Sequence, residues 1–344
     1  MKAEEDCGSG CVMPAEWETH ESTWLAWPKN PLTFESKIIH EVEETYVEII
    51  ESLAPGERVD LLVDGEKDEE YVLSCLSHTG NVRFHKIRTA DVWVRDYGPI
   101  FVRRMDRAGI VATKWIFNAW GSKYDDLLPD NNAGLEIAGR ASVSGIVETG
   151  MVLEGGSIDA NGSGLMLTTE QCLLNRNRNP GLDRRQISEM LSRYLGTREL
   201  IWLKGGIAGD DTDGHVDDVA RFVSGNSVIC MREKNEQSPN HSILKENADI
   251  LRKFRKEDGG YLDVVEIQMP ELSEGSVGLP GSYANFYIGN SAVLVPVFGC
   301  KQDGAAIDAL REFFPQKRIK DIDCRALIHG FGALHCITQQ QPLP

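Results

Sequence analysis

Nine consecutive residues hold the densest group of side chains that could do chemistry. The stretch 210–218 reads D-D-T-D-G-H-V-D-D, with one imidazole and five carboxylates around one glycine. A strand that begins at Gly214 would place His215 and Asp217 on the same face, because side chains alternate along a strand. A histidine beside a carboxylate can transfer protons or bind a cation. The alternative is a solvated acidic loop that carries one surface histidine.

Four other segments place a polar or reactive residue among apolar neighbours. They are W-V-R-D-Y-G-P with Trp93 and Asp96, V-L-E-G-G-S with Glu154, S-Y-A-N-F-Y with Asn285, and L-H-C-I-T with Cys336. Plain structural explanations exist: an ion pair or a turn cap for the carboxylates, core packing for the tryptophan, a backbone bond for the asparagine and burial for the thiol. We expect a shared central site instead, because such residues recur at similar places along the chain.

Together these residues would give one site a thiol, an imidazole, several carboxylates and an aromatic ring. Two carboxylates can grip a guanidinium, whose donors form a planar fork. A bound cation would favour the thiolate of Cys336, and His215 could protonate a leaving amine and then deprotonate water. His335 precedes Cys336, and on a strand their side chains would point to opposite faces. We therefore expect His215, not His335, to be the acid and base.

The composition excludes several classes of protein. Hydrophobic content of 41% and charged content of 26% over 344 residues are typical of a globular chain, and the net charge of −17 argues against nucleic acid or an anionic membrane as partner. The N-terminus lacks the apolar core of a secretory signal, and no apolar run approaches the length of a membrane span. We expect a cytoplasmic protein with reduced cysteines. No C-x-x-C pair occurs, which argues against structural zinc.

The elements that would position these residues repeat along the chain. A strand, a turn rich in glycine or asparagine and a second strand recur, as in β-hairpins, at 90–110, 153–168, 215–231 and 283–298. Helical spacing of apolar residues occurs at 35–54, 186–195, 243–255 and 305–314. Intervals of 72, 58, 61 and 70 residues separate the comparable points Trp24, Asp96, Glu154, His215 and Asn285. We predict an α/β propeller of five degenerate modules around a central cleft, as a single domain over 1–344 with a flexible N-terminal segment at 1–12.

Seven motifs between about residues 13 and 341 resemble the family of agmatine deiminases and bacterial-type peptidylarginine deiminases, which belongs to the guanidine-modifying superfamily. In chain order they are W-V-R-D-Y-G-P, N-A-W-G-S-K-Y, L-E-G-G-S, T-T-E-Q-C-L-L-N-R-N-R-N-P, D-G-H-V-D, S-Y-A-N-F-Y and H-C-I-T-Q-Q. The resemblance implies a five-module α/β propeller, in agreement with the repeat. No single motif is specific for this family, but the seven motifs in this order are.

The resemblance also implies roles for the matched residues. Cys336 would be the nucleophile and His215 the general acid and base. Asp96 and Asp217 would hold the guanidinium nitrogens. Glu154 would lie beside the guanidinium and orient His215. Trp93 would line the substrate channel.

Two departures from the family pattern concern the far end of the substrate. The segment before H-C is G-F-G-A-L at 330–334 rather than G-G-G-N-I, and 211–215 reads D-T-D-G-H rather than an acidic residue followed by T-N-G-H. Asp211 stands where agmatine enzymes often carry glutamate. We place Asp211 and Asn285 with the substrate-binding residues. The loop at 123–125 is either a cover for a ligand or an ordinary surface loop.

The expected reaction is hydrolysis of agmatine to N-carbamoylputrescine and ammonia, feeding putrescine biosynthesis, through a covalent thiouronium on Cys336 with no cofactor and no metal. One alternative keeps this chemistry and takes free arginine or peptidyl-arginine. Another is a metal-dependent hydrolase with His215, Asp217, Asp218 and other acids as ligands. A single well-placed histidine argues against zinc, whereas metals that prefer oxygen ligands stay open. A third is a non-catalytic binder of guanidines or polyamines. The sequence leaves open whether the chain forms a homo-oligomer.

Overall fold

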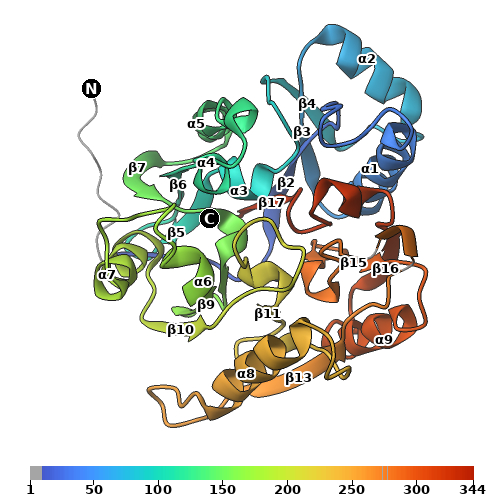
Figure 1. Cartoon of the computed structure of the whole chain (residues 1–344). Helices are drawn as coiled ribbons and strands as arrows, with labels where there is room; N and C mark the ends of the chain where they lie inside the picture. The colour runs from blue at the N-terminus through green and yellow to red at the C-terminus, as the bar shows by residue number, and fades with distance from the viewer. Residues whose placement is uncertain (1–9, 273, 277) are drawn as a thin grey trace.

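The computed structural model describes residues 10–344 except 273 and 277, and its elements run from β1 to β17 (Figure 1). The strands are β1 (Cys11–Val12), β2 (His20–Ala26), β3 (Arg58–Val63), β4 (Val82–Lys86), β5 (Ile100–Arg104), β6 (Ile110–Ile116), β7 (Gly145–Val152), β8 (Ile158–Ala160), β9 (Leu165–Thr169), β10 (Glu199–Leu203), β11 (Ala220–Phe222), β12 (Ser227–Arg232), β13 (Asp263–Gln268), β14 (Tyr287–Ile288), β15 (Ala292–Val297), β16 (Arg318–Asp323) and β17 (Gln339–Pro342). The α-helices are α1 (Ile39–Leu53), α2 (Glu66–Cys75), α3 (Val94–Tyr97), α4 (Ala119–Ser122), α5 (Asp130–Arg140), α6 (Glu170–Leu173), α7 (Arg184–Leu195), α8 (Asn240–Lys253) and α9 (Asp303–Phe313). Short 3-10 helices are η2 (Asp125–Leu127), η3 (Gly155–Ser157), η4 (Val216–Asp218), η5 (Glu274–Ser276), η6 (Tyr283–Asn285) and η7 (Leu327–Gly330).

The strands of the described chain form five separate sheets that share one plan. In four of the sheets an antiparallel hairpin, and in the fifth the antiparallel pair of β17 and β2, is followed by a helix and then by a strand parallel to the second strand of the pair. The sheet orders are β1-β5-β6-β7, β10-β9-β8, β11-β12-β13, β14-β15-β16 and β17-β2-β3-β4. A parallel pair needs a long crossover, and here a helix supplies it.

The last sheet joins the two ends of the chain. Strand β17 pairs antiparallel with β2, so that Gln339 lies opposite Trp24. The first hairpin strand of this sheet therefore comes from the C-terminus and the second from the N-terminal part. In Figure 1 the five sheets follow one another around the molecule, with α1, α2, α5, α7, α8 and α9 towards the periphery.

Local sequence explains the crossover helices. In α1 the buried side chains Val42, Tyr46, Ile49 and Leu53 recur every three or four residues, which gives one apolar face. Helix α7 begins at a capping box, in which the side chain of Asp183 accepts from the Gln186 amide and the Gln186 side chain accepts in return.

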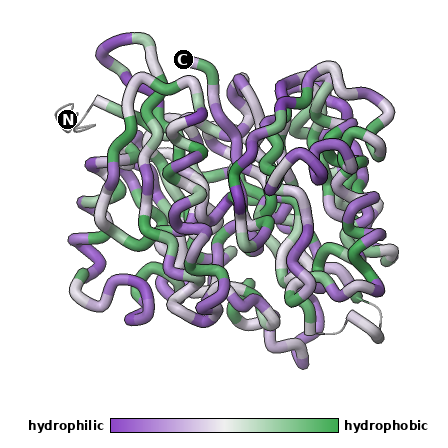
Figure 2. Tube along the Cα trace, turned by 90° about the horizontal axis from the view of Figure 1, so that it is seen from above, coloured by the Kyte–Doolittle hydropathy of each residue, from purple (hydrophilic) through white to green (hydrophobic). Residues whose placement is uncertain are grey.

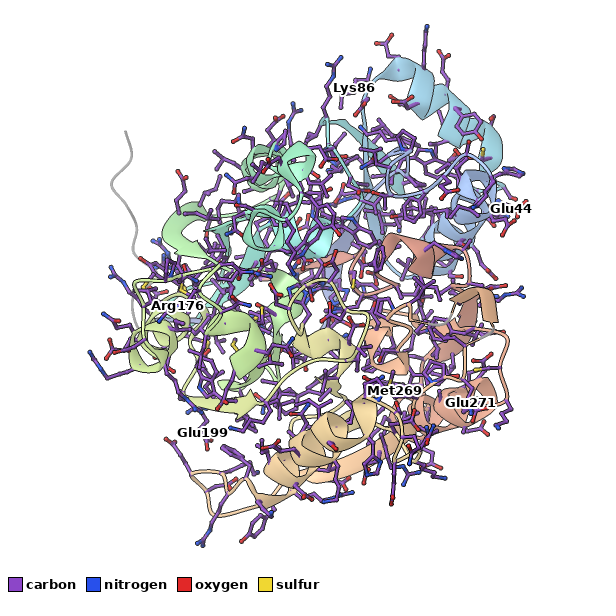
Figure 3. All side chains as sticks on the ribbon, in the orientation of Figure 1. Glu44, Lys86, Arg176, Glu199, Met269 and Glu271 are labelled. Carbon is purple, nitrogen blue, oxygen red and sulfur yellow. The ribbon has the colours of Figure 1, made fainter. Side chains whose placement is uncertain are left out.

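Apolar residues fill the space between these elements. Strand β15 is buried along almost its whole length, as expected of a strand covered on both faces. Hydrophobic and hydrophilic residues alternate along the trace in Figure 2, and the labelled charged side chains Glu44, Lys86 and Glu199 lie at the margin of Figure 3. Among the described residues, no helix is both long and apolar enough to cross a membrane.

The hairpins begin differently from the prediction. We expected strands to run through the polar residues of 90–104, 153–158, 215–223 and 283–288. Instead a single helical turn, α3, η3, η4 or η6, precedes each first hairpin strand. At 210–218 the Asp210 carboxylate accepts the amides of Gly214 and His215, and Asp213 and Gly214 have positive φ. This bend prevents a strand from starting at Gly214.

Two further expectations need correction. Trp24 is not the counterpart of Asp96, Glu154, His215 and Asn285, because it lies in the second strand of its hairpin. The turn before β17, which contains Cys336, takes that place. Residues 1–9 of the expected flexible segment lie outside the described residues, whereas Cys11–Val12 pair with β5 as strand β1.

Candidate active site

Five single turns carry the predicted site residues. Each turn stands immediately before the first strand of a hairpin, and the side chains that these turns present are Asp96, Glu154, His215 with Asp217, Asn285 and Cys336. All are nearly or completely buried. A helical turn, unlike a strand, lets two residues of one short segment enter the same site.

Cys336 contacts two of the other predicted residues. Its Sγ atom accepts a hydrogen bond of 3.1 Å from Asn285 Nδ2 and lies 3.8 Å from Asp217 Oδ2. Burial raises the pKa of the Cys336 thiol well above its ordinary value, and the carboxylates of Asp217, Asp218 and Asp96 add to this effect. The thiol is therefore neutral at neutral pH, and additional positive charge beside it would favour the thiolate.

Asn285 is hydrogen-bonded to the turn that carries Cys336 and is not among the residues that line the pocket that opens onto Cys336. Its Nδ2 atom also donates to Asp218 Oδ1 at 3.0 Å, and its Oδ1 atom accepts from the backbone amides of His335 and Cys336 at 2.9 and 3.4 Å. It is fully buried. These contacts fix the position of the Cys336 turn, and the expected role of Asn285 in substrate binding stays a prediction.

His215 is fully buried, and neither ring nitrogen makes a hydrogen bond of ordinary length to a described residue. Its Nδ1 atom lies 3.8 Å from Asp96 Oδ1. Burial alone would lower the pKa of His215, but Asp96, the nearby Cys172 thiol and Asp217 together raise it well above the ordinary value. The imidazole can thus hold a proton at neutral pH and has a nitrogen free to donate it.

One carboxylate oxygen of Asp217 is bound within the protein core, and the other is free to bind a ligand. Its Oδ2 atom lies 2.6 Å from His335 Nδ1, and its Oδ1 atom has no hydrogen-bond partner among the described residues. Burial raises the pKa of Asp217, but His335, His215 and Arg221 outweigh this effect and lower it. A buried, ionised carboxylate with one free oxygen suits a cationic ligand.

The reason given for excluding His335 is wrong, because residues 334–337 form a turn rather than a strand. Both ring nitrogens of His335 nevertheless have hydrogen-bond partners. Its two ring nitrogens lie 2.6 Å from Asp217 and 3.0 Å from Glu16 Oε2. Glu16 also pairs with Arg95 and Arg221. His335 therefore supports the site from the core and has no nitrogen left for acid–base work.

Glu154 pairs with an arginine that the sequence reasoning did not single out. Its Oε1 atom accepts from Arg178 Nε at 2.7 Å, both side chains are fully buried, and Glu154 Oε2 has no described partner. The ion pair that we considered for Glu154 is therefore present. One carboxylate oxygen of Glu154, the Cys172 Sγ atom and one ring nitrogen of His215 all lie within 4.8 Å of one another, which places Glu154 beside the imidazole.

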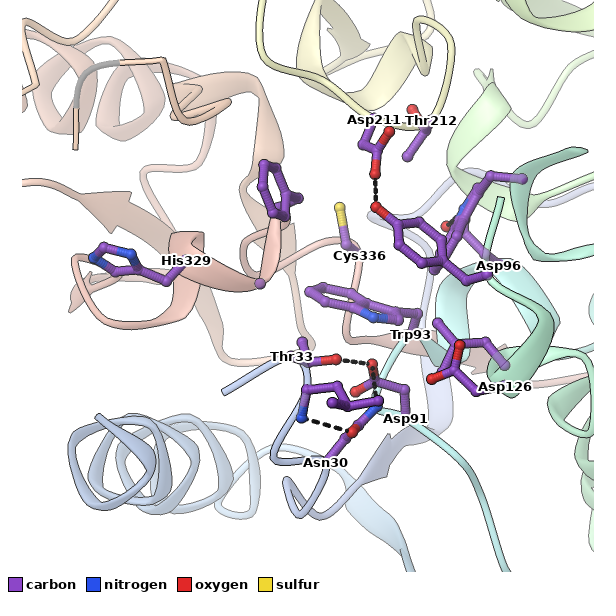
Figure 4. Close-up of a pocket in the computed structure, with 16 residues that line it drawn as sticks. Asn30, Thr33, Asp91, Trp93, Asp96, Asp126, Asp211, Thr212, His329 and Cys336 are labelled. Carbon is purple, nitrogen blue, oxygen red and sulfur yellow. Dashed lines mark hydrogen bonds between the residues drawn. The ribbon is translucent and has the colours of Figure 1, made fainter. Parts of the chain in front are cut away.

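An acidic pocket of about 180 Å³ opens onto Cys336. Trp93, which we expected to line a substrate channel, lines this pocket, and so do Asp96 and Asp211. In Figure 4 Cys336 and Trp93 lie in the middle of the pocket, between Asp211 with Thr212 on one side and Asp91 with Asn30 and Thr33 on the other. Among the described residues that line it there are four aspartates and no lysine or arginine, and those aspartates are Asp91, Asp96, Asp126 and Asp211.

Asp211 is already contacted by the loop that follows N-A-W-G. Tyr124 donates its hydroxyl to Asp211 Oδ2, and Lys123 Nζ lies 3.7 Å from Asp211 Oδ1 and 2.8 Å from Asp213 Oδ1. Burial raises the pKa of Asp211, Lys123 lowers it and Asp213 raises it. The loop at 123–125 thus joins the 210–218 segment across one side of the pocket.

Two groups of three described side chains have donor atoms close enough to share a metal ion. They are Glu154, Cys172 and His215, and Asp217, Asp218 and Cys336. His215 belongs to the first group and Asp217 with Asp218 to the second, so the residues considered as metal ligands are divided between the two groups. Each group contains a predicted catalytic side chain, so a metal bound there would occupy the predicted guanidine site.

Sequence reasoning missed several residues of the site. Trp120 and Arg178 lie inside motifs that we quoted, so the motifs pointed to them without giving a role. Glu16 and Asp91 had no local signal, whereas Tyr124 ends the motif N-A-W-G-S-K-Y and lies in the 123–125 loop that was considered as a cover for a ligand. Asp91 is a buried carboxylate whose pKa is raised to about 6 by burial, although Thr33, Asn30 and the Val92 amide donate to it.

Fold and site together define an α/β protein whose acidic pocket holds one cysteine, with a buried histidine against one of the pocket carboxylates. Residues 12–342 match the model of the Porphyromonas-type peptidyl-arginine deiminase family. The chain belongs to this family.

Relatives and solved structures of similar length agree with this assignment. The agmatine deiminase of Stutzerimonas stutzeri is 34% identical over 97% of this chain and 96% of its own. The structure of agmatine deiminase of Enterococcus faecalis superposes with a TM-score of 0.90 at 30% identity, over 97% of this chain and 96% of that one. A cysteine-to-serine variant of C. jejuni agmatine deiminase with substrate bound has a TM-score of 0.86 at 31% identity, with 96% of both chains covered.

Proposed function

We propose that this protein hydrolyses the guanidinium group of agmatine to give N-carbamoylputrescine and ammonia. The observation that carries the proposal is the pocket, which places Cys336 among aspartates and has no lysine or arginine among its described lining residues. A substrate with two positive charges suits such a lining. Free arginine would bring a carboxylate for which these residues offer no cationic partner. The names of the full-length relatives support the same substrate.

The proposed chemistry uses the charge of the substrate to activate the thiol. Asp96 and Asp217 grip the guanidinium nitrogens, and the bound cation offsets the carboxylates that keep Cys336 protonated. The thiol releases its proton to solvent, so that the sulfur can form a bond to the guanidinium carbon, and it regains a proton when the product leaves. His215 protonates the departing nitrogen, the carbon–nitrogen bond breaks and ammonia leaves a thiouronium on Cys336. His215 next accepts a proton from water, the water oxygen bonds to the same carbon, and the carbon–sulfur bond breaks to release the carbamoyl product.

The same proposal includes the architecture that holds these residues. We infer that the five sheets are the modules of a propeller with approximate five-fold symmetry, and that the chain is one domain. The shared sheet plan, the turn before each hairpin and the β17–β2 pairing support this arrangement. The site would then lie where the five turns converge.

The test is ammonia release from agmatine in the presence of a strong chelator, with the product identified by mass. We expect N-carbamoylputrescine, and turnover of agmatine well above that of arginine or an arginyl peptide. Turnover of arginine or the peptide alone would keep the cysteine chemistry and change the substrate. Loss of activity with the chelator, restored by a metal, would favour the metal-dependent hydrolase. Binding of agmatine without turnover of any guanidine would favour the non-catalytic binder.

A further inference from the structure

Trp120 is hydrogen-bonded to one of the carboxylates of the site. Its indole Nε1 atom donates to Asp96 Oδ2 at 2.9 Å, while the Gly156 amide donates to Asp96 Oδ1 at 3.0 Å. Both Trp120 and Asp96 are buried, and both line the pocket. Asp96 therefore has one fixed donor on each oxygen. Two such donors define the plane of the carboxylate and the direction of its remaining lone pairs.

The backbone that carries Trp120 adopts a conformation that non-glycine residues rarely take. Ala119, Trp120 and Ser122 have φ values of 52°, 52° and 60°, and Gly121 has 87°. A left-handed conformation costs a non-glycine residue roughly 1–2 kcal/mol. Four consecutive residues of this kind persist only where the surrounding structure holds them, and such strain gathers at functional sites.

Contacts on both sides hold this turn. The Asn118 side chain accepts from the Gly121 amide at 2.8 Å and donates to the backbone oxygen of Asn177 at 2.9 Å. A β-carbon at Gly121 would lie 2.3 Å from the Asn177 side chain, so the turn is packed against that segment. The indole is enclosed by the rings of Trp93, Phe117 and Tyr124, with centroids 5.2–6.5 Å away.

We propose that the left-handed turn at 119–122 directs Trp120 to Asp96, and that Trp120 is a positioning residue that holds the Asp96 carboxylate in the orientation that faces the guanidinium. The proposal rests on the assigned guanidine chemistry and deepens it, because Asp96 is the side chain on which Trp120 acts. Trp120 takes no part in bond making. Its indole N–H is the only group of the turn that reaches Asp96 among the described hydrogen bonds.

The charged groups around Asp96 explain why loss of the Trp120 hydrogen bond should change the pKa of Asp96. The titratable groups that face Asp96 are the imidazole of His215 at 3.8 Å, the carboxylates of Asp217 and Glu154, and the Cys336 thiol. Burial raises the pKa of Asp96 to about 6, His215 lowers it, the two carboxylates raise it and the Trp120 hydrogen bond lowers it. Loss of the indole donor should raise the pKa further. Since ionised Asp96 binds the substrate, the acidic limb of kcat/KM should then move to higher pH.

The kinetic test is the pH profile of kcat/KM for Trp120→Phe, which keeps an aromatic ring and removes the N–H donor. We expect the acidic limb to move up by about one pH unit, so that the loss at acidic pH exceeds the loss at pH 8 by about tenfold. Trp115→Phe is the matched control. Trp115 is also buried, and its Nε1 atom donates over the same 2.9 Å to Thr113 Oγ1. Trp120→His, which retains a donor, should lie closer to the wild-type profile.

An NMR titration tests the contact without a substrate. The chain has seven tryptophans, so ¹⁵N-tryptophan labelling gives few indole signals. The Trp120 signal, identified by its absence in Trp120→Phe, should shift with pH around a midpoint near 6 in the wild type and stay still in Asp96→Asn. The Trp115 signal should not follow this titration. Should Trp120→Phe fail to fold, the Trp120 signal is identified instead as the one that stops titrating in Asp96→Asn.

The proposal would be overturned if the indole NMR signal of Trp120 titrated in the same way in the wild type and in Asp96→Asn, or did not titrate in either. It would also be overturned if the acidic limb of the kcat/KM profile lay at the same pH in Trp120→Phe and in Trp115→Phe. Absence of agmatine turnover in the wild-type protein would overturn the proposed function alone, because the NMR titration needs no substrate.

Discussion

A β-carbon at Gly156 would lie 2.6 Å from Nδ1 of His215. The same atom would come within 2.9 Å of Asp96 Oδ1 and 3.0 Å of Asp217 Oδ2. The second glycine of L-E-G-G-S therefore leaves room for three side chains of the site to converge. Real β-carbons essentially never come this close to other heavy atoms, so any larger residue must displace the site.

Gly156→Ala should consequently lower kcat/KM for agmatine by about 100-fold or more, since a displacement of about 1 Å can have that effect. The thermal midpoint should change less than the activity. Gly139→Ala is the control, because nothing lies within 4 Å of its would-be β-carbon and alanine favours its helix α5. Equal activities of the two variants would contradict this view of the site.

Cys336→Ala should abolish turnover, with a loss of roughly 10³-fold or more, as when other covalent nucleophiles are removed. Folding should persist, because Asn285 keeps its bond to Asp218. Circular dichroism and a steady-state assay measure the two effects. Cys75→Ala, at the end of helix α2, is the matched thiol replacement and should remain active. Substantial turnover by the Cys336 variant would remove the thiouronium mechanism.

Arg178→Met should destabilise the fold by roughly 3–5 kcal/mol, because it leaves the fully buried Glu154 carboxylate without its partner. Urea denaturation measures the change. The double variant with Glu154→Met should recover part of the stability while remaining inactive. Arg185→Met is the control, since its pair with Glu189 is exposed and should contribute less than about 1 kcal/mol. A loss no larger than that of the control would mean that the buried pair is not structural.

Asp130 should make the free energy of unfolding depend on pH. Burial raises its pKa to about 7, and the backbone amides of Ala90 and Asp91 only partly offset this. Between about pH 4 and pH 7 the carboxyl of Asp130 is therefore protonated in the folded state and ionised in the unfolded state. The contribution of Asp130 to the free energy of unfolding is lost as the pH rises through this window. Three pH units correspond to about 4 kcal/mol as an upper limit.

Asp130→Asn should flatten this part of the profile, and denaturant titrations at pH 5 and pH 8 measure it. Asp125→Asn, on the exposed loop, serves as the control. An unchanged difference between the two pH values in the Asp130 variant would assign the effect to other carboxylates, among them Asp91 and Asp96, whose pKa values burial raises to about 6.

Asp211→Asn should raise KM for agmatine by about tenfold, the effect of 1.4 kcal/mol of lost attraction for the distal ammonium, and change kcat little. Asn can still accept the Tyr124 hydroxyl, so the loop contact is retained. Butylguanidine, which lacks the amine, is the comparison substrate, and its KM should not respond. A similar rise for both substrates would place Asp211 at the guanidinium end or in loop structure.

The sequence predicted the repeat because hydrophobic periodicity and turn residues are local signals. The hairpin turns near residues 105–109, 161–164, 224–226 and 289–291 and the helices α1, α7, α8 and α9 agree with the structure. The single turns before the hairpins were not predicted. Their conformation depends on contacts that are distant in sequence, such as the bond from Asn285 to Cys336, which no local pattern records.

The residue types of the site could also be predicted, since a thiol, an imidazole and several carboxylates in apolar segments suit few purposes other than chemistry on a cation. What each residue contacts could not. Asn285 holds the Cys336 turn, His335 is locked between Asp217 and Glu16, and Trp120 reaches Asp96.

The sequence by itself thus determined the succession of modules and the reactive groups that they carry. Only the tertiary structure decided which turn opens the fifth hairpin, because β17 reaches β2 across the whole length of the chain. It also decided the ionisation of the site, because burial and the mutual approach of charges set the pKa values of Asp96, His215 and Cys336. The strand pairing and the pKa values both depend on spatial distances between residues that are far apart in the sequence, and these distances cannot be read from the sequence alone.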